Sequence, residues 1–352
     1  MKGRTVRNPA EWLGYLERFN DVGLGDIYFD QAYVNLYAGS TSCSEVFIYE
    51  ANDELFFLPW LVRPIECPIL SGPAFDFETA YGYGGPLSTS KDQAFLTEAW
   101  GAVKATCLAR NIICGLLRFH PLLDTHDYCI DDASLKVVND RDTVILTLAK
   151  SPDAIWAQYS SGTRNKIRKG EKAGVEVLVR TDSGALSIFA EMYEAHMKEL
   201  SAHEDYNFGD TYFQNFRKLG EGSYRVYLAQ HNGKVLGGAL VLLSRRWAHY
   251  HLSSSLKEFS SLAPNNLLRH AVIMDLLNGS WEKLHFGGGR TSSGDDSLLK
   301  FKSGYSPERG VFRFGKYVTD MDVYNSVCSW WNKSYPHLQE QFASRLLKYR
   351  FR

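Results

Sequence analysis

The sequence predicts an α/β protein built from two domains of similar architecture in tandem. The chain has 352 residues, which is enough for two domains of roughly 150 residues each. Hydrophobic residues make up 45% and charged residues 22%, a balance typical of an ordinary soluble globular protein and not of a disordered one. The same order of helices and strands is predicted twice along the chain. We place the first domain at 1–149, the second at 150–315 and a helical tail at 316–352.

In the first domain, capping residues and apolar spacing predict the elements. Asn8-Pro9 begins a helix, because Asn is a good N-cap and Pro fits the first turn. A hairpin is expected to turn at Asn52-Asp53-Glu54, and a glycine-rich turn follows later. The other predicted helices are 26–37 and 91–110, the hairpin strands are 46–49 and 55–62, the glycine-rich turn is 81–86, and the last strands are 112–119 and 143–148.

The second domain repeats this order. Ser151-Pro152 opens a helix that is expected to run to about Lys172, and a hairpin turns at Asn232-Gly233. The halves match in the order of their elements and not residue by residue, so the repeat is one of architecture. The other predicted helices are 184–200, 210–219 and 264–277, the strands are 224–229, 235–243, 247–253 and 284–286, and one last helix is 320–347.

The composition argues against several classes of protein. No apolar run approaches the ~20 residues that a membrane span needs, and the N-terminal stretch lacks the apolar core of a signal peptide, so we expect a cytoplasmic protein. Peripheral association with a membrane stays open. The formal charge of −1 argues against an extended nucleic-acid footprint, although a small basic patch is compatible with it. The six cysteines include no CxxC pair, which favours reduced thiols and predicts no metal site.

The most informative stretch is KLHFGGGRTSSGDDSLLKFKSGY, residues 283–305. It predicts a short strand, the glycines Gly287, Gly288 and Gly289, a polar loop, and a helix at 297–303 that carries Phe301 and Lys302. Consecutive glycines allow positive φ or the close approach of another group to the backbone. Tight packing and the approach of an acyl group explain them equally well.

Five sequence blocks in register resemble the Fem-type (FemAB/FemX-like) aminoacyltransferases of the GNAT superfamily, within a BioF2-like acetyltransferase-domain subgroup. The most specific block is the hydrophobic residue before Gly-Gly-Gly, followed by an acidic residue, two apolar residues and Phe-Lys. The other four blocks are Tyr81–Pro86, Arg164–Lys172, His196-Met197 with Tyr206–Phe208, and Asn266–Leu268. Because the blocks extend from about residue 81 to 305, the resemblance covers most of the chain.

The resemblance implies two tandem GNAT-like (acyl-CoA N-acyltransferase-like) domains with mixed central sheets, and a tail that returns to pack on the first domain. It also implies that Lys302 contacts the activated acyl donor. Physically, this ammonium can hold a donor phosphate or stabilise the oxyanion that forms when an amine attacks the acyl carbonyl. Both roles stay open.

A basic stripe is predicted on the helix after Ser151. Arg164, Arg168 and Lys172 are spaced i, i+4 and i+8, so they lie along one side of the helix. Such a stripe is typical of a solvated face, and the resemblance favours phosphate binding instead. The resemblance also favours Tyr81 and Tyr83 as lining of an acceptor groove and Tyr206 as a substrate-binding residue.

Tyr250 and His251 are the candidate catalytic residues on the strand 247–253. A tyrosine hydroxyl can orient an amine, and a neutral imidazole can accept a proton. A structural role for the histidine is equally compatible with the pattern. Asp295 and Asp296 are expected to cap the helix at 297–303. The chain lacks a serine nucleophile elbow, a Walker loop and a dinucleotide fingerprint, so a covalent intermediate is not favoured.

The acyl donor is expected to be a co-substrate and not a bound cofactor. Residues 253–266, where a GNAT enzyme usually holds the pyrophosphate of coenzyme A, contain no glycine, which disfavours acetyl-CoA. The resemblance then implies transfer from the acceptor end of aminoacyl-tRNA to the amine of a peptidoglycan precursor, a phosphorylated or lipid-linked acceptor. Two alternatives are an N-acyltransferase that uses acyl-CoA or an acyl carrier protein on an amino sugar or natural-product amine, and a non-catalytic binding module in envelope-polymer biosynthesis.

Overall fold

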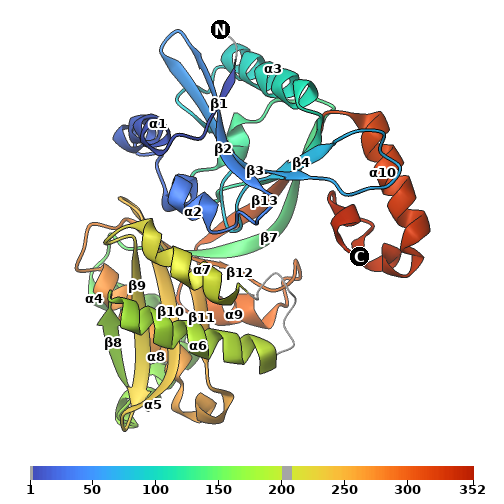
Figure 1. Ribbon diagram of the computed structural model, residues 1–352. Helices are drawn as coiled ribbons and strands as arrows, with labels where there is room; N and C mark the ends of the chain where they lie inside the picture. Colours follow the sequence, from blue (N-terminus) through green and yellow to red (C-terminus); the bar gives the residue numbers. More distant parts are fainter. Residues whose placement is uncertain (1–2, 200–207) are drawn as a thin grey trace. The chain divides into compact units, whose positions relative to one another are not determined.

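The computed structural model describes residues 3–199 and 208–352, which form two compact units (Figure 1). Unit 1 comprises Met1–Asp140 and Phe312–Arg352, and unit 2 comprises Arg141–Val311. The chain passes between the units within two strands, β7 (Leu135–Thr147) and β13 (Arg309–Val318). Each unit has helices packed on a mixed sheet, which confirms the predicted α/β class.

The sheet of unit 1 has the strand order β1-β2-β3-β4-β6-β13, with β5 paired to β3. Only β4 and β6 run parallel, because a crossover through α3 separates them in the chain. The strands are β1 (Arg4–Val6), β2 (Cys43–Ala51), β3 (Glu54–Pro64), β4 (Phe75–Glu78), β5 (Leu87–Ser88) and β6 (Ile112–Arg118). The helices are α1 (Pro9–Asp21), η1 (Ile27–Phe29), α2 (Gln31–Asn35), α3 (Gln93–Ala109), η2 (Thr125–Tyr128), α10 (Met321–Ser334), η6 (Pro336–Leu338), α11 (Gln339–Phe342) and η7 (Lys348–Arg350).

Unit 1 has two apolar clusters on its sheet. Helix α3 contributes Trp100, whose ring meets Phe56 of β3 edge-on with centroids 5.6 Å apart. The second cluster joins Val327 and Trp331 of α10 to Ile113 of β6, so the C-terminal residues of the chain pack on this sheet. Burying such side chains contributes about 1.5–3 kcal/mol each, which is ample to hold α10 in place.

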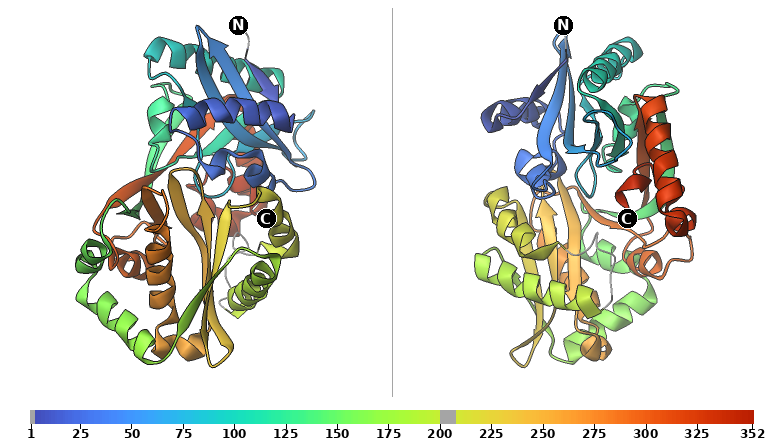
Figure 2. Two further views of the ribbon diagram at one scale, coloured as in Figure 1. Left: turned by 90° about the vertical axis from the view of Figure 1, so that its left-hand side faces the viewer. Right: turned by 45° about the vertical axis from the view of Figure 1, so that its right-hand side comes forward.

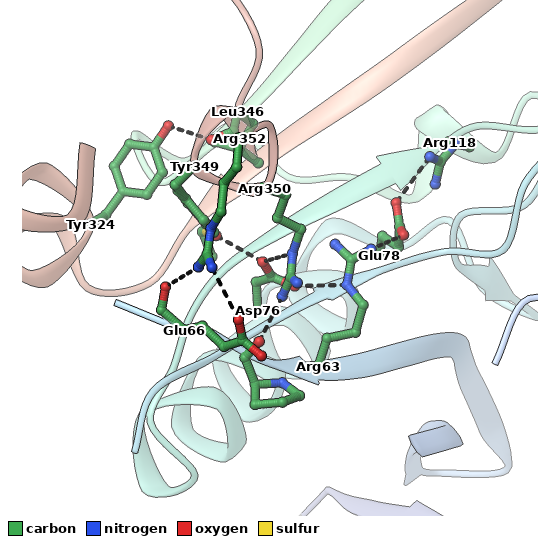
Figure 3. Close-up of polar contacts among 12 residues, drawn as sticks. Arg63, Glu66, Asp76, Glu78, Arg118, Tyr324, Leu346, Tyr349, Arg350 and Arg352 are labelled. Atoms are coloured by element: carbon green, nitrogen blue, oxygen red, sulfur yellow. Dashed lines mark hydrogen bonds and ion pairs between the residues drawn. The ribbon is translucent and has the colours of Figure 1, made fainter. Parts of the chain in front are cut away.

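An ionic network in unit 1 fixes the end of the chain (Figure 3). The buried carboxylate of Asp76 accepts from Arg63 Nε at 3.0 Å, from Tyr349 Oη at 2.8 Å and from Arg350 Nε at 2.7 Å. Glu78 pairs with Arg63 and with Arg118. Burial alone would raise the pKa of Glu78, but the two guanidinium charges outweigh burial and lower it. Each carboxylate therefore has two arginine partners.

In unit 2 the strand order is β7-β12-β11-β10-β9-β8. Helices α6 and α7 cover one face of this sheet, and α8 with α5 covers the other (Figure 2). The strands are β8 (Glu176–Arg180), β9 (Tyr224–His231), β10 (Lys234–Leu243), β11 (Trp247–Ser255) and β12 (Lys283–Gly288). The helices are α4 (Pro152–Gln158), α5 (Ser161–Lys172), α6 (Ser183–Glu199), α7 (Gly209–Phe216), η4 (Arg217–Leu219), η5 (Lys257–Leu262), α8 (Pro264–Leu276) and α9 (Ser297–Ser303).

Two strands in the middle of this sheet separate partway along their length. Strands β11 and β12 are parallel and pair from Trp247 with Lys283 to His249 with His285, and no pairing follows. Each strand also has a register shift against its antiparallel neighbour near this point. Such bulges bend a strand away from its partner. The residues that follow, Tyr250 on β11 and Phe286 on β12, therefore leave the paired region together.

Three predicted helices are wrong in their extent. The helix predicted from Ser151 to Lys172 is two helices, because Ser160 is extended and its side chain accepts from the Thr163 N–H as the N-cap of α5. The helix predicted at 26–37 is η1 followed by α2, separated at the extended residue Asp30. The helix predicted at 320–347 ends at Ser334, since a proline at 336 disfavours helical backbone at Tyr335.

Five strands were not predicted from the sequence: β1, β4, β5, β8 and β13. The strand predicted at 143–148 is the end of the longer β7, which begins at Leu135. The other predicted elements are present with small changes at their ends, and the helix predicted at 297–303 is confirmed as α9. Within the described residues, no helix combines the length and the hydropathy that crossing a membrane requires.

Candidate active site at the end of strand β12

The three glycines at the end of β12 each have a local structural reason. Gly287 has a φ of +75°, which side chains rarely adopt. A Cβ on Gly288 would lie 2.9 Å from the Asp142 carbonyl oxygen of β7, and a Cβ on Gly289 would lie 2.5 Å from Asp296 Oδ1. Packing therefore accounts for all three glycines. Their bare backbone also leaves the Gly288 carbonyl oxygen available as an acceptor.

Lys302 provides the hydrogen bond to that carbonyl. Its side chain is on α9, is only 9% exposed, and donates from Nζ to Gly288 O at 2.7 Å. Burial first, and then the charges of Arg269 and Arg141, lower the pKa of Lys302 to about 7 against the opposing charge of Asp296. Near neutral pH the side chain is thus poised between ammonium and amine.

Asp296 holds the loop between β12 and α9. Its Oδ1 accepts from the N–H groups of Leu298 and Leu299, both at 2.9 Å, which confirms the predicted cap. Its Oδ2 accepts from the N–H groups of Arg290 at 2.9 Å and Thr291 at 3.0 Å. These backbone hydrogen bonds, led by the one from Leu299, lower the pKa of Asp296 to about 2 even though burial opposes the change. Asp296 is therefore a loop organiser that stays ionised.

Arg269 is a buried cation that the sequence analysis missed. It is on α8 and 3% exposed, and its guanidinium carbon lies 4.6 Å from the ring centre of Tyr250 and 4.5 Å from that of Phe301. The sequence did contain a signal. Arg269 begins the buried i, i+3, i+4, i+7 set that continues with Val272, Ile273 and Leu276, so a charged residue occupies an apolar position.

Of the two catalytic candidates on β11, only Tyr250 contacts this cluster. Its ring lies between Arg269 and Phe286, whose ring centre is 6.0 Å away. His251 contacts α7 instead, where Tyr212 Oη is 2.7 Å from its Nε2. Burial, followed by the neighbouring His249, lowers the pKa of His251 to about 3. The imidazole is therefore neutral at physiological pH and is a weak base.

The predicted basic stripe on α5 makes local contacts. Arg164 donates to the carbonyl oxygen of Ala157 at 3.2 Å and to that of Tyr159, and thereby caps the end of α4. The Arg168 guanidinium carbon lies 5.3 Å from the ring centre of Trp156. The start of α5 also adjoins α9, since the Ser160 N–H donates to the Gly304 carbonyl oxygen at 2.9 Å. The stripe thus begins beside the helix that carries Lys302.

The remaining candidates are elsewhere. Tyr81 and Tyr83 are in unit 1, where the Tyr81 ring is 5.8 Å from that of Tyr37 and the Tyr83 ring is 5.4 Å from that of Tyr28. Tyr206 lies outside the described residues. Unit 2 therefore contains one coherent group of candidate residues, formed by Lys302, Phe301, Tyr250 and the additional Arg269.

Comparisons with known proteins match the part of the chain that contains these residues. The family model described as "Acetyltransferase (GNAT) domain" matches residues 157–303, which extend from the end of α4 to the end of α9. No curated protein matches the chain. Among solved structures, FemX has a TM-score of 0.69 at 13% identity, over 92% of this chain and 99% of that chain.

Two further solved structures share the fold. The C-terminal domain of a putative lysylphosphatidylglycerol synthetase from Agrobacterium fabrum has a TM-score of 0.55 at 13% identity, over 88% of this chain and 92% of that chain. A tandem GNAT protein from the clavulanic acid biosynthesis pathway has a TM-score of 0.50 at 10% identity, over 89% and 98% of the respective chains.

These matches define the fold. It is that of two GNAT-like domains in tandem, as predicted, and residues 157–303 match the GNAT acetyltransferase domain. The chain is similar in fold to FemX, as the resemblance of its short sequence blocks to the Fem-type enzymes predicts.

Proposed function

We propose that this acyltransferase transfers an aminoacyl group from aminoacyl-tRNA to the amine of a cell-wall or peptide precursor. The observation that carries the proposal is the Lys302 ammonium, which is buried at the end of β12 and held 2.7 Å from the Gly288 carbonyl oxygen. An amine that attacks an ester places negative charge on the carbonyl oxygen. A buried cation at that point stabilises the charge far better than water does.

The reaction requires no covalent intermediate. The amine nitrogen bonds to the acyl carbon, the ester carbon–oxygen bond breaks, and the departing hydroxyl takes up the proton that the amine loses. The buried thiols of unit 1 are poor alternative nucleophiles, because burial raises the pKa of Cys107 to about 12 and raises those of Cys114 and Cys129 as well. Alignment of two substrates and stabilisation of one oxyanion are sufficient.

The local structure of residues 253–266 supports aminoacyl-tRNA over an acyl-CoA donor. This segment forms η5 where a glycine-rich pyrophosphate loop would be expected. It is packed tightly on α5, because a Cβ on Gly170 would lie 2.8 Å from the Leu262 carbonyl oxygen. The fold of the lysylphosphatidylglycerol synthetase domain is compatible with the same proposal, since that protein's name describes an aminoacyl group joined to a phospholipid.

An acyl-CoA donor is the second candidate. The matching family model is described as an acetyltransferase domain, and the tandem GNAT protein from the clavulanic acid pathway is described in a form without AcCoA, which names that donor for the relative. In this case the acceptor is an amino sugar or another natural-product amine, and each turnover releases a free thiol.

A donor competition separates the two candidates. Purified protein is given labelled aminoacyl-tRNA mixtures and acyl-CoAs together, with peptidoglycan precursors and simple amines as acceptors. We expect label to move from tRNA to a precursor amine in the native chain and not in Lys302→Met. Lys300→Met is the matched control, because Lys300 is on the same helix but its side chain is 62% exposed and pairs with Asp295. Transfer from coenzyme A thioesters alone would refute the tRNA donor.

A further inference from the structure

The guanidinium of Arg269 is buried without a protein counter-charge. Among the residues that the structure describes, its polar contact is one hydrogen bond from Nη1 to the Asn265 carbonyl oxygen at 3.3 Å, and it forms no ion pair. The two aromatic rings offset part of the cost of removing the charge from water. An unpaired buried ion still costs several kcal/mol. A purely structural role does not explain why this side chain is charged.

Two other arginines of unit 2 show what a stabilised stacked arginine contains. Arg225 lies over Trp281 and pairs with Asp275 at 2.5 Å, and Arg246 lies over Trp247 and pairs with Glu282 at 2.6 Å. Both have an aromatic ring and a carboxylate. Arg269 has two rings and no carboxylate, so the component that it lacks is an anion.

Unsatisfied donors mark the position of that anion. Arg269 Nε and Tyr250 Oη are both buried and both lack a hydrogen-bond partner in the described part of the chain, and their side chains are in contact. Ser253 is near enough to affect the Tyr250 hydroxyl but does not meet hydrogen-bond geometry. An unsatisfied buried donor is unfavourable, and a bound anion that accepts from it would recover this cost.

Asp296, the acid that influences Lys302, cannot fill this role. Asp296 influences Lys302 electrostatically, yet both of its oxygens already accept backbone N–H groups of the loop and of α9. Lys302 likewise forms no ion pair among residues 3–199 and 208–352, and its one hydrogen bond goes to a neutral carbonyl. The site therefore holds two buried cations and an additional hydroxyl donor.

We propose that Arg269, with the Tyr250 hydroxyl and the Lys302 ammonium, binds an anionic group of the substrate, either a carboxylate or a phosphate. Arginine suits this role because its planar fork grips a carboxylate or a phosphate with two hydrogen bonds. That the anion belongs to the substrate rests on the proposed acyl transfer. That the site binds an anion does not depend on that proposal.

Anion binding can be tested on the full chain without a transfer assay. The midpoint of thermal unfolding is measured against inorganic phosphate and, separately, succinate, with chloride keeping the ionic strength constant. We expect a saturable rise of the midpoint with at least one anion, since a ligand that binds the folded state stabilises it. A rise with phosphate alone identifies a phosphate group, and a rise with succinate alone identifies a carboxylate. No saturable rise with either anion would overturn the proposal.

Two variants connect the effect to Arg269. Arg269→Met should keep its midpoint in chloride and lose the saturable rise, while Arg246→Met, a stacked arginine with its own carboxylate, should keep it. General stabilisation by phosphate as a salt would persist in both variants. Arg269→Lys, which keeps the charge but loses the fork, provides a second test with an expected affinity loss of about tenfold. Unchanged affinity in Arg269→Lys and in Arg269→Met would contradict the site.

The outcomes also separate this proposal from the proposed function. Phosphate binding that depends on Arg269, together with a failure of every donor in the competition, would support the anion site and refute the aminoacyl transfer. The reverse outcome is transfer that depends on Lys302, with anionic and neutral acceptors used equally by the native chain and by Arg269→Lys. It would support the aminoacyl transfer and refute the anion site.

Discussion

The two units bury their charges in opposite ways. In unit 1, Arg63, Arg118 and Arg350 share the carboxylates of Asp76 and Glu78, and each carboxylate has two arginine partners (Figure 3). In unit 2, Arg269 and Lys302 are buried but contact carbonyl oxygens and aromatic rings. In the first arrangement the positive and negative charges are paired within the protein. In the second, the described residues supply no anion for the two cations.

This difference distinguishes structure from function. A buried ion pair that is fully hydrogen-bonded holds segments together, and breaking it destabilises the fold because a charge is left without a partner. A buried cation without a counter-ion lowers stability from the outset and gains its partner when an anionic ligand or transition state arrives. The Asp76 network should therefore respond to mutation in stability, and the Lys302 cluster in activity.

The largest effect is expected at Asp76. Asp76→Asn removes a fully buried carboxylate that the partly buried Arg63 and Arg350 share, so the free energy of unfolding should fall by about 3 kcal/mol. Chemical denaturation of the full chain measures the change. Glu282→Gln is the control, since it breaks an exposed pair with Arg246 and should cost at most about 1 kcal/mol. Equal losses in the two variants would show that the network is no stronger than a surface pair.

Lys302→Met should lower activity and leave stability unchanged or higher, the opposite of what is expected for Asp76→Asn. It removes the cation that we place at the developing oxyanion, so kcat should fall by about 10²–10³, equivalent to about 2.7–4 kcal/mol. Because Met fills similar space without a charge, stability should stay the same or rise. Single-turnover transfer and denaturation of the same preparation measure both quantities. If Lys302→Met is less stable than the native chain but fully active, Lys302 has a structural role like that of the charges around Asp76 in unit 1.

The difference in stability between Lys302→Met and the native chain should depend on pH. The pKa of Lys302 is about 7 in the folded chain and near 10.5 when unfolded, so the unfolded chain binds more protons between these values. Stability of the native chain should therefore rise with pH from 7 towards 10, and the advantage of Lys302→Met should shrink by roughly 2–3 kcal/mol between pH 6 and pH 9. Parallel denaturation curves at the two pH values test this. A constant difference would mean that the lysine keeps its ordinary pKa.

Gly289→Ala should disturb the loop that supports Lys302. The added Cβ would lie 2.5 Å from Asp296 Oδ1, so the carboxylate must leave its backbone partners, and a loss of about 1–3 kcal/mol is expected. Gly294→Ala is a matched control in the same loop, because a Cβ there meets nothing within 4 Å. If both variants unfold at the same denaturant concentration, the Asp296 cap does not organise the loop.

The sequence predicted the fold where local signals and tertiary contacts agree. Helix α9 and the hairpin of β9 and β10 were found because capping and turn residues mark their ends. Strand β8 was missed because its pairing partner, β9, comes well after it in the chain, and β4 was missed because its four residues are too few to show an alternating pattern. The split between α4 and α5 depends on one N-cap, Ser160, inside an otherwise helical pattern.

The site was predictable where a residue pattern is specific, as for Lys302 and Phe301. Sequence could not show that Lys302 donates to Gly288 or that His251 contacts α7, because both facts depend on how the strands bulge and separate. Arg269 was missed because a single charged residue in an apolar stripe does not by itself show that its side chain is buried. Its significance depends on the two aromatic rings that come from β11 and α9.

The smallest effect is expected at Arg168, which represents a third kind of cation, exposed and stacked on Trp156. Arg168→Gln should cost only about 0.5–1 kcal/mol of stability, the usual size of an exposed cation–π contact. If the α5 stripe holds a donor phosphate, the same variant should raise KM for aminoacyl-tRNA severalfold, and added salt should reduce this difference because salt weakens phosphate contacts in general. Arg180→Gln, an exposed arginine of β8 that pairs with Asp182, is the control. A KM that changes equally in both variants would leave the stripe as a solvated helix face, so that unit 2 has one anion site, at Arg269 and Lys302, and not two.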